Sequence, residues 1–342
     1  MKTSLLQKPA SRAARELALR FLKDAEAACR RLADPDDIEA LHDFRVALRR
    51  LRSIVRAYTP HLKDALPKKL RKRIGELAAG TGTARDTEVQ LAWLVQQREN
   101  VRPHEQPGYH WIVSRLEHRR LEEYADLRER LPTDFARLRD RLKTRLELNY
   151  DDGDETLGEV TATLLLEAAD EFHDELAQVH SEENEEAVHR ARIAAKRLRY
   201  LLEPLAKLLP DGKALVRELK EFQEIMGEVH DVQVFGIELR QAAEEAGAER
   251  MRRLIDLSLR LPHDDPELEA ARHSDERAGL IALAHELHER RLDLCARLLA
   301  KVNEGEADRF FHHLEAAVAE LRRPTEETSD ADEHEDENRV PD

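Results

Sequence analysis

The sequence predicts an all-α protein, and three observations support this fold class. Aromatic residues, which favour sheets together with β-branched residues, make up only 4% of the 342 residues. Alanine, leucine, glutamate and arginine, which are strong helix formers, dominate the composition. Apolar residues also recur with the period of an α-helix along most of the chain. A chain of this length forms one large domain or two moderate ones.

The helices expected in the first half end at recognisable stop signals. Helical periodicity covers roughly 11–32 and ends at Asp-Pro-Asp-Asp. The next helix covers roughly 36–59 and stops before Pro60, because the residue before a proline disfavours helical geometry. A third helix starts near position 64, is interrupted by Gly-Thr-Gly-Thr at 80–83 and resumes directly afterwards.

A run of turn-forming residues divides the chain. Two further helices are expected over roughly 108–130 and 133–149, and the segment Asn-Tyr-Asp-Asp-Gly-Asp-Glu follows them at 149–155. We therefore place a boundary there, which separates a first helical bundle, 1–150, from a second, 151–323.

The second half is expected to repeat the order of the first. One helix covers about 156–180, and the next starts near 185 and is kinked or interrupted at Pro204. A long helix follows from about 213, with a break expected near Gly227. Similar motifs in the same order in both halves indicate an internal duplication of helical units.

Two helices about 147 residues apart carry nearly the same motif. The first reads HDFRVALRRLR from position 42, and the second reads HRARIAAKRLR from position 189. At ~100° per residue, the basic residues of each copy fall within a sector of roughly 80°, opposite the apolar residues. The two stripes consist of His42, Arg45, Arg49, Arg52 and Arg56 in the first helix and His189, Arg192, Lys196 and Arg199 in the second. An ordinary surface helix mixes charge signs, so stripes of a single sign indicate an anionic partner.

Two arginines of the motif lie outside the stripes. Arg50 and Arg197 fall about 80° away from them. We expect both to form ion pairs between helices rather than to bind a ligand.

The charge distribution is compatible with an anionic ligand despite a net charge of −15. Nine acidic residues and one arginine give the segment 325–342 a charge of −8, and residues 324–342 are expected to be a disordered acidic tail. Residues 41–73 carry a local charge of +9, and residues 187–220 carry +6. Because salt screens charges beyond about 8–10 Å, local charge governs contact binding more than the distant balance does.

The sequence predicts a cytoplasmic protein. Its two cysteines, Cys29 and Cys295, are far apart in sequence and are expected to stay reduced. No run approaches the ~20 apolar residues of a membrane span. The N-terminal residues lack the apolar region of a secretory signal.

These motifs resemble the CHAD family, the conserved histidine α-helical domain, from about residue 10 to 323. The resemblance rests on H-x-x-R-x-x-x-[RK]-R-L-R twice, followed by Arg85-Asp86 in the first half and M-G-x-x-H-D at 226–231 in the second. It implies two helical bundles related by pseudo-twofold symmetry, which form one CHAD-like unit with a basic surface or channel between them. It also implies binding of inorganic polyphosphate without catalysis. The chain departs from the family pattern at 79–83, where the family usually has a leucine-glycine junction.

The predicted polyphosphate-binding residues combine the stripes with basic residues on the following helices. Lys68 and Lys72 align with Lys213 and Arg217. The full predicted set is His42, Arg45, Arg49, Arg52, Arg56, Lys68, Lys72, Arg85, His189, Arg192, Lys196, Arg199, Lys213, Arg217 and His230. From His42 to Arg56 the first stripe is about 21 Å long at 1.5 Å per residue, so it meets several phosphates in succession.

The residues that follow the expected breaks have a second, purely structural interpretation. Asp86 and Asp231 are expected to cap the following helices through their N–H groups, whereas Arg85 and His230 stay in the predicted site. No cofactor and no metal site are expected, since His285-Glu-Leu-His-Glu lacks the H-E-x-x-H spacing.

Two other functions compete with polyphosphate binding. The same basic surface could bind single-stranded nucleic acid, but readers of single strands interleave aromatic residues for stacking, and only Tyr200 lies near a basic face. An enzyme acting on phosphate polymers needs carboxylates beside the basic residues to hold Mg²⁺, and the stripes contain none. Binding without turnover is favoured, with inositol phosphates as potential competitors and targeting to polyphosphate granules as a cellular role.

Overall fold

The computed structural model describes residues 3–34, 37, 39–150, 153–181, 184–273 and 276–321. Within these residues every regular element is a helix, and a single isolated β-bridge joins Pro9 to Thr156. The predicted all-α fold class is confirmed. The acidic tail expected over 324–342 lies outside the described residues.

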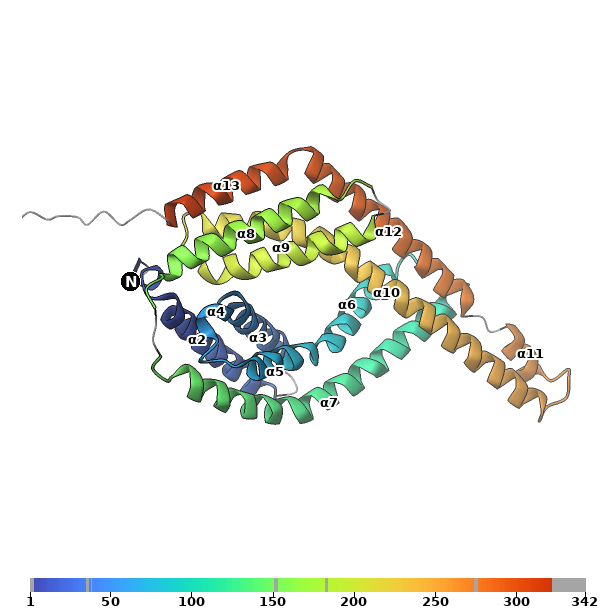
Figure 1. Ribbon diagram of the computed structural model, residues 1–342. Coiled ribbons are helices and arrows are strands. Elements are labelled where there is room, and N and C mark those ends of the chain that lie inside the picture. The colour runs from blue at the N-terminus through green and yellow to red at the C-terminus, as the bar shows by residue number, and fades with distance from the viewer. Residues whose placement is uncertain are drawn as a thin grey trace, which may run out of the picture.

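The helices pack in two groups that face each other (Figure 1). In the first group, α2 (Ala10–Arg31) packs along α3 (Glu39–Ala57), and α5 (Lys68–Ala79) and α7 (Gln106–Leu146) pack against them. In the second group, α8 (Leu157–Ala177) packs along α9 (Glu185–Leu205), with α10 (Gly212–Ser258) and α13 (Glu306–Leu321) against these two. The remaining helices are α1 (Thr3–Leu6), α4 (Thr59–Leu62), α6 (Gly82–Gln97), α11 (Pro266–His273) and α12 (Arg277–Asn303).

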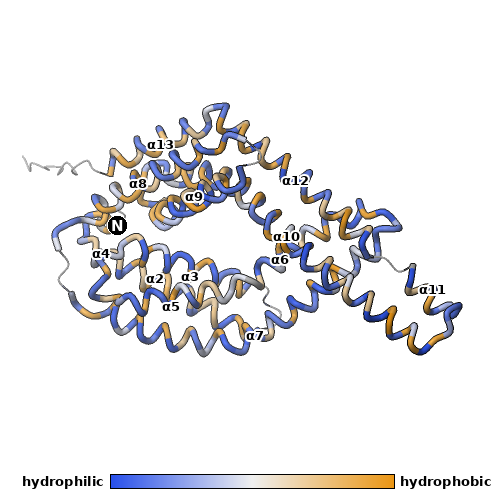
Figure 2. The backbone as a smooth tube through the Cα atoms, turned by 45° about the vertical axis from the view of Figure 1, so that its right-hand side comes forward, coloured by the Kyte–Doolittle hydropathy of each residue, from blue (hydrophilic) through white to orange (hydrophobic). Residues whose placement is uncertain are grey.

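The amphipathic pattern of the helices explains this packing. Figure 2 shows hydrophobic and hydrophilic positions alternating along the tube, as amphipathic helices require. The buried apolar faces of both groups join in one hydrophobic core. Phe44 of α3 packs edge-on against Phe135 of α7, with ring centroids 5.1 Å apart. A buried hydrogen bond of 2.6 Å between the Tyr58 and Thr161 hydroxyls links the first group to α8.

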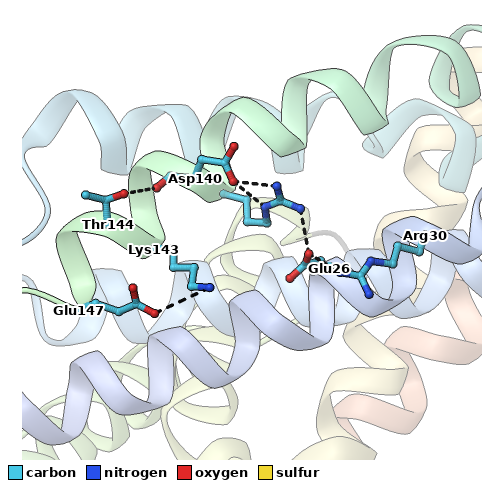
Figure 3. A network of polar contacts seen from close by, with 7 residues as sticks. Glu26, Arg30, Asp140, Lys143, Thr144 and Glu147 are labelled. Carbon is cyan, nitrogen blue, oxygen red and sulfur yellow. Dashed lines mark hydrogen bonds and ion pairs between the residues drawn. The ribbon is translucent and has the colours of Figure 1, made fainter.

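Ion pairs fix α7 to α2 on the outer side of the first group. Arg139 of α7 contacts Glu26 of α2 at 2.8 Å and its neighbour Asp140 at 2.7 Å. Glu26 is shared with Arg30, so two guanidinium groups meet one carboxylate (Figure 3). The arginines here are thus neutralised by acidic partners.

Two predicted interruptions are absent. The expected helices 108–130 and 133–149 are one continuous helix, α7, with Pro132 in its interior. Leu131 and Phe135 on either side are buried, so packing holds the helix through the proline, which removes one backbone hydrogen bond. Likewise α10 continues through Gly227, because Met226 and Val229 are buried and a single glycine weakens a helix by only about 1 kcal/mol.

Other predicted boundaries are confirmed. The break at 80–83 separates α5 from α6, and Pro204 lies in the last turn of α9. None of the described helices combines the length and the apolarity that crossing a membrane requires. Cys29 and Cys295 are buried free thiols.

Candidate functional site

A cavity of about 950 Å³ lies between α3 and α9. Basic side chains from both groups of helices line it, and ten of the fifteen residues predicted from the sequence are among them. These ten are Arg45, Arg49, Arg52, Arg56, Arg85, His189, Arg192, Lys196, Arg199 and His230. The structure therefore brings both basic stripes to one cavity.

The apolar faces of α3 and α9 orient the stripes. On α3, Phe44, Leu48 and Leu51 are buried in the core, which leaves the basic residues on the cavity side. On α9 the buried face consists largely of alanines and leucines. The side chain of Asn184 caps α9 by accepting a hydrogen bond of 3.2 Å from the Ala187 N–H.

The arginines outside the stripes form the ion pairs that the sequence predicted. Arg50 on α3 contacts Glu203 on α9 at 2.6 Å, and Arg197 on α9 contacts Glu171 on α8. Arg197 also lines the cavity, which its position on the helical wheel did not indicate. Glu203 stays ionised: burial alone would raise its pKa, but Arg50, together with Arg49 and Arg199, holds that pKa below its usual range.

The stripe residues differ from these arginines because most of them lack an acidic partner. Among the described residues, no carboxylate forms an ion pair with the following six cavity cations: Arg45, Arg49, Arg52, Arg56, Arg192 and Lys196. Arg45 instead donates a hydrogen bond to the backbone carbonyl of Thr81. Because like charges repel, such a cluster is unfavourable until an anion enters it.

Several guanidinium nitrogens in the cavity are buried without a hydrogen-bond partner. The Nε atoms of Arg49, Arg192 and Arg199 each lack an acceptor within the described part of the chain. Buried polar groups in folded proteins are almost always hydrogen-bonded, and leaving one unpaired costs about 1–3 kcal/mol. Each of these N–H groups would gain a hydrogen bond if a movement of its arginine side chain brought it to an acceptor oxygen of a ligand.

Burial and mutual repulsion shift the pKa values of the cavity cations. The pKa of Lys196 falls to about 8, chiefly through burial and then through the charge of Arg192. The pKa of His230 falls to about 4 through burial, with Arg192, Lys196 and His189 adding to the shift. Burial also lowers the pKa of Arg45 and Arg192. The surroundings of these side chains thus disfavour their positive charge. A bound anion would stabilise it.

Asp86 and Asp231 do not cap helices as the sequence suggested. Asp86 lies in the second turn of α6, whose N-cap residue is Thr81, and Asp231 lies in the middle of α10. Burial raises the pKa of both carboxyl groups, although Arg45 and Arg192 oppose the shift at Asp86, and Arg192 opposes it at Asp231. In the sequence, the only indication that these two acidic residues lie near the cavity cations is their position directly after Arg85 and His230.

The other predicted residues lie elsewhere. His42 lines an adjoining cavity of about 650 Å³ next to α7, which shares Arg45, Arg49 and Arg85 with the cavity between α3 and α9. Four further predicted residues line neither of these two cavities: Lys68, Lys72, Lys213 and Arg217. Lys72 is 3.3 Å from Glu76 on its own helix. A role for these four residues in binding stays a prediction.

One aromatic residue lines the cavity between the stripes. The guanidinium carbon of Arg49 lies 5.1 Å from the ring centroid of Tyr200, and that of Arg199 lies 5.5 Å from it. In the described residues, no group of three or more His, Cys, Asp or Glu side chains is placed to hold a metal ion.

Comparisons with known proteins identify the family and the fold. The family model for the CHAD domain matches residues 13–240. The crystal structure of the CHAD domain from the plant Ricinus communis superposes with a TM-score of 0.57 at 24% identity, covering 81% of this chain and 93% of that one. PptA from Streptomyces chartreusis gives a TM-score of 0.57 at 13% identity, covering 90% and 99%. At these identities the solved structures show a shared fold alone. No curated protein sequence matches the chain.

Proposed function

The chain belongs to the CHAD domain family, and we propose that it binds inorganic polyphosphate, without turnover, in the cavity between α3 and α9. The observation that carries the proposal is the set of six cavity cations named above that form no ion pair with a described carboxylate. They come from both helices, so one ligand would satisfy donors on opposite walls.

The chemistry of polyphosphate matches this lining. The polymer has no base and no apolar surface, so only charge and hydrogen bonds to its phosphate oxygens can recognise it. Arginine offers a planar fork for two oxygens, and lysine offers a mobile point charge. Stripes about 21 Å long on α3 and about 15 Å long on α9, at 1.5 Å per residue, favour a linear chain of phosphates over a single compact anion. The internal duplication inferred from the repeated motif would give the chain a similar wall on each side.

Single-stranded nucleic acid is the alternative ligand, and the state of Tyr200 argues against it. Binding of single strands uses aromatic rings as stacking platforms for bases. The guanidinium groups of Arg49 and Arg199 already lie over the ring of Tyr200 and occupy the surface on which a base would stack. Inositol phosphates share the phosphate chemistry and belong among the competitors in a binding test.

We attribute to this site a binding role rather than turnover because its donor set is dominated by cations. Asp86 on α6 and Asp231 on α10 both interact with the cavity cations Arg192 and Lys196, so these two carboxylates already face positive side chains. Metal-assisted phosphoryl transfer needs ionised oxygen ligands around Mg²⁺. A binding protein of this kind would act in the cytoplasm and could bring partners to polyphosphate granules.

A direct titration tests the proposal. Long-chain polyphosphate is titrated into the protein, with single-stranded RNA, an inositol phosphate and a short phosphate oligomer as competitors. A variant in which Arg45, Arg49, Arg192 and Lys196 are all replaced by Glu should lose binding. Tight, salt-sensitive binding that RNA barely displaces would support the proposal.

The matched control reverses the same number of charges elsewhere. Lys63, Arg141, Lys207 and Arg253 are exposed and line none of the cavities described above, so their replacement by Glu should leave the affinity nearly unchanged. Equal loss in both variants would mean that net charge, and not the cavity, determines binding. Tighter binding of RNA than of polyphosphate would overturn the proposal.

A further inference from the structure

We infer that Tyr200 is a positioning residue that holds Arg49 and Arg199 in the phosphate-binding geometry through its ring; this inference rests on the proposed function. Tyr200 is half-buried on α9 and lines the cavity. The guanidinium carbons of Arg49 on α3 and Arg199 on α9 lie 5.1 Å and 5.5 Å from its ring centroid. Both distances are within the range of a cation–π interaction.

An aromatic ring holds an arginine differently from a carboxylate. A carboxylate partner neutralises the charge and occupies N–H donors, as Glu203 does for Arg50 at 2.6 Å. A ring attracts the flat face of the guanidinium group, which keeps its charge and leaves the donors at its edge free. The Nε atoms of Arg49 and Arg199 have no hydrogen-bond acceptor in the described part of the chain, which agrees with this arrangement. The ring thus orders two arginines while they stay available to a phosphate.

The acidic residue nearest this pair supports the same conclusion. Glu203 is 3.8 Å from the Nε atom of Arg199, which is a long contact, and its shorter contact is with Arg50. Arg50 is therefore the main ion-pair partner of Glu203. Tyr200 is left as the aromatic partner of Arg49, for which no ion pair with a described carboxylate exists.

The arrangement also couples the two walls of the cavity. Arg49 belongs to α3 in the first group of helices, whereas Tyr200 and Arg199 belong to α9 in the second. Without the ring, Arg49 would be one long, flexible side chain among like charges, and ordering it on binding would reduce the affinity. Because the ring orders Arg49 before the ligand arrives, less conformational entropy is lost on binding.

The experiment compares polyphosphate affinity in three single variants. Tyr200→Leu, which removes the ring but no charge, should weaken binding by roughly tenfold, since two cation–π contacts are lost. Tyr200→Phe, which keeps the ring, should stay within about threefold of the original protein. Tyr150→Leu is the matched control, because Tyr150 stacks with Arg15 at 5.2 Å but does not line the cavity; it should leave the affinity unchanged.

A double-mutant cycle separates positioning from a merely structural role. If Tyr200 acts through the two arginines, the effect of Tyr200→Leu should disappear in an Arg49→Ala, Arg199→Ala background. A structural role would instead lower the melting temperature and leave the same loss of affinity in both backgrounds. Tyr200→Leu binding as tightly as the original protein, or Tyr200→Phe failing to restore binding, would overturn the inference. Absence of binding in the original protein would overturn the proposed function itself.

Discussion

Burial, followed by the charge of Arg192, lowers the pKa of Lys196 to about 8. The groups that face it are Arg192 and Arg199 on α9, Arg49 on α3 and Asp231 on α10, and of these only Asp231 raises the pKa. Polyphosphate would stabilise the charged form of Lys196. We therefore predict that the affinity falls roughly tenfold between pH 7 and pH 9, as Lys196 loses its proton in the free protein. Titrations at fixed ionic strength across this range measure the effect.

Replacing Lys196 with Arg provides the control for this pH dependence. Arginine stays protonated across the range, so Lys196→Arg should bind with an affinity that is nearly independent of pH between 7 and 9. In the original protein, the unfolded chain binds more protons than the folded one between about pH 8 and 10.5, so the free energy of unfolding should rise with pH there. An affinity equally steep in both proteins would assign the pH dependence to another group.

The histidines show where residue-level prediction from the sequence reaches its limit. The sequence placed His230 in the predicted site by its position after an expected helix break. The pKa of His230 falls to about 4, because burial and three neighbouring cations act together on it. A helical wheel places side chains on a face, but it carries no information about how deeply each one is buried.

Pro132 in α7 allows a prediction at the scale of a helix. A proline in a helix interior removes a hydrogen bond and clashes with the carbonyl four residues earlier, at about 3 kcal/mol. Pro132 is exposed, so its side chain contributes little packing. Pro132→Ala should therefore raise the free energy of unfolding by about 1–3 kcal/mol, measured by denaturant titration.

The second proline of α7 supplies the matched control. Pro107 lies in the first turn, where a proline is tolerated because its missing N–H would have no partner within the helix. Pro107→Ala should therefore change the stability little. Equal stabilisation by both substitutions would contradict this account, because the effect of removing a proline on the unfolded chain is destabilising at either position.

The same two long helices show what sequence patterns do and do not predict about elements. The boundaries of α2, α3 and α8 follow from apolar periodicity with errors of a few residues. The continuity of α7 through Pro132 and of α10 through Gly227 depends on tertiary packing of buried neighbours. Local signals therefore suggest helix breaks that packing overrides.

The meeting of the two stripes was predictable, and its details were not. The repeated motif and the resemblance that it carries led to the expectation of one shared basic surface, and ten predicted residues do line one cavity. That Lys72 lies outside this cavity, and that Asp86 approaches the cations, depends on how α5 and α6 are oriented relative to α3 and α9. No periodicity within a helix determines that orientation.

At the scale of the whole molecule, one hydrophobic core spans both groups of helices and holds the basic walls together. The walls repel each other, while the core and the ion pair between Arg50 on α3 and Glu203 on α9 oppose that repulsion. The arginines of this protein thus fall into two classes. Those paired with acids stabilise the fold, whereas those of the stripes destabilise it until a ligand is bound.

Arg192 and Arg139 represent the two classes and test this division. The pKa of Arg192 is lowered even though Asp231 is nearby, so its surroundings disfavour the cation on balance. Arg192→Met should therefore raise the melting temperature of the free protein by a few degrees and weaken polyphosphate binding. Arg139→Met removes the partner of Glu26 and Asp140 (Figure 3), so it should lower the melting temperature and leave the affinity unchanged. In the original protein, polyphosphate at a hundred times its Kd should add about 2.7 kcal/mol of stability, and this gain should shrink in Arg192→Met alone.

Melting temperatures of the three proteins, with and without polyphosphate, measure these effects. A lower melting temperature with undiminished binding in Arg192→Met would place Arg192 among the structural arginines and contradict the division.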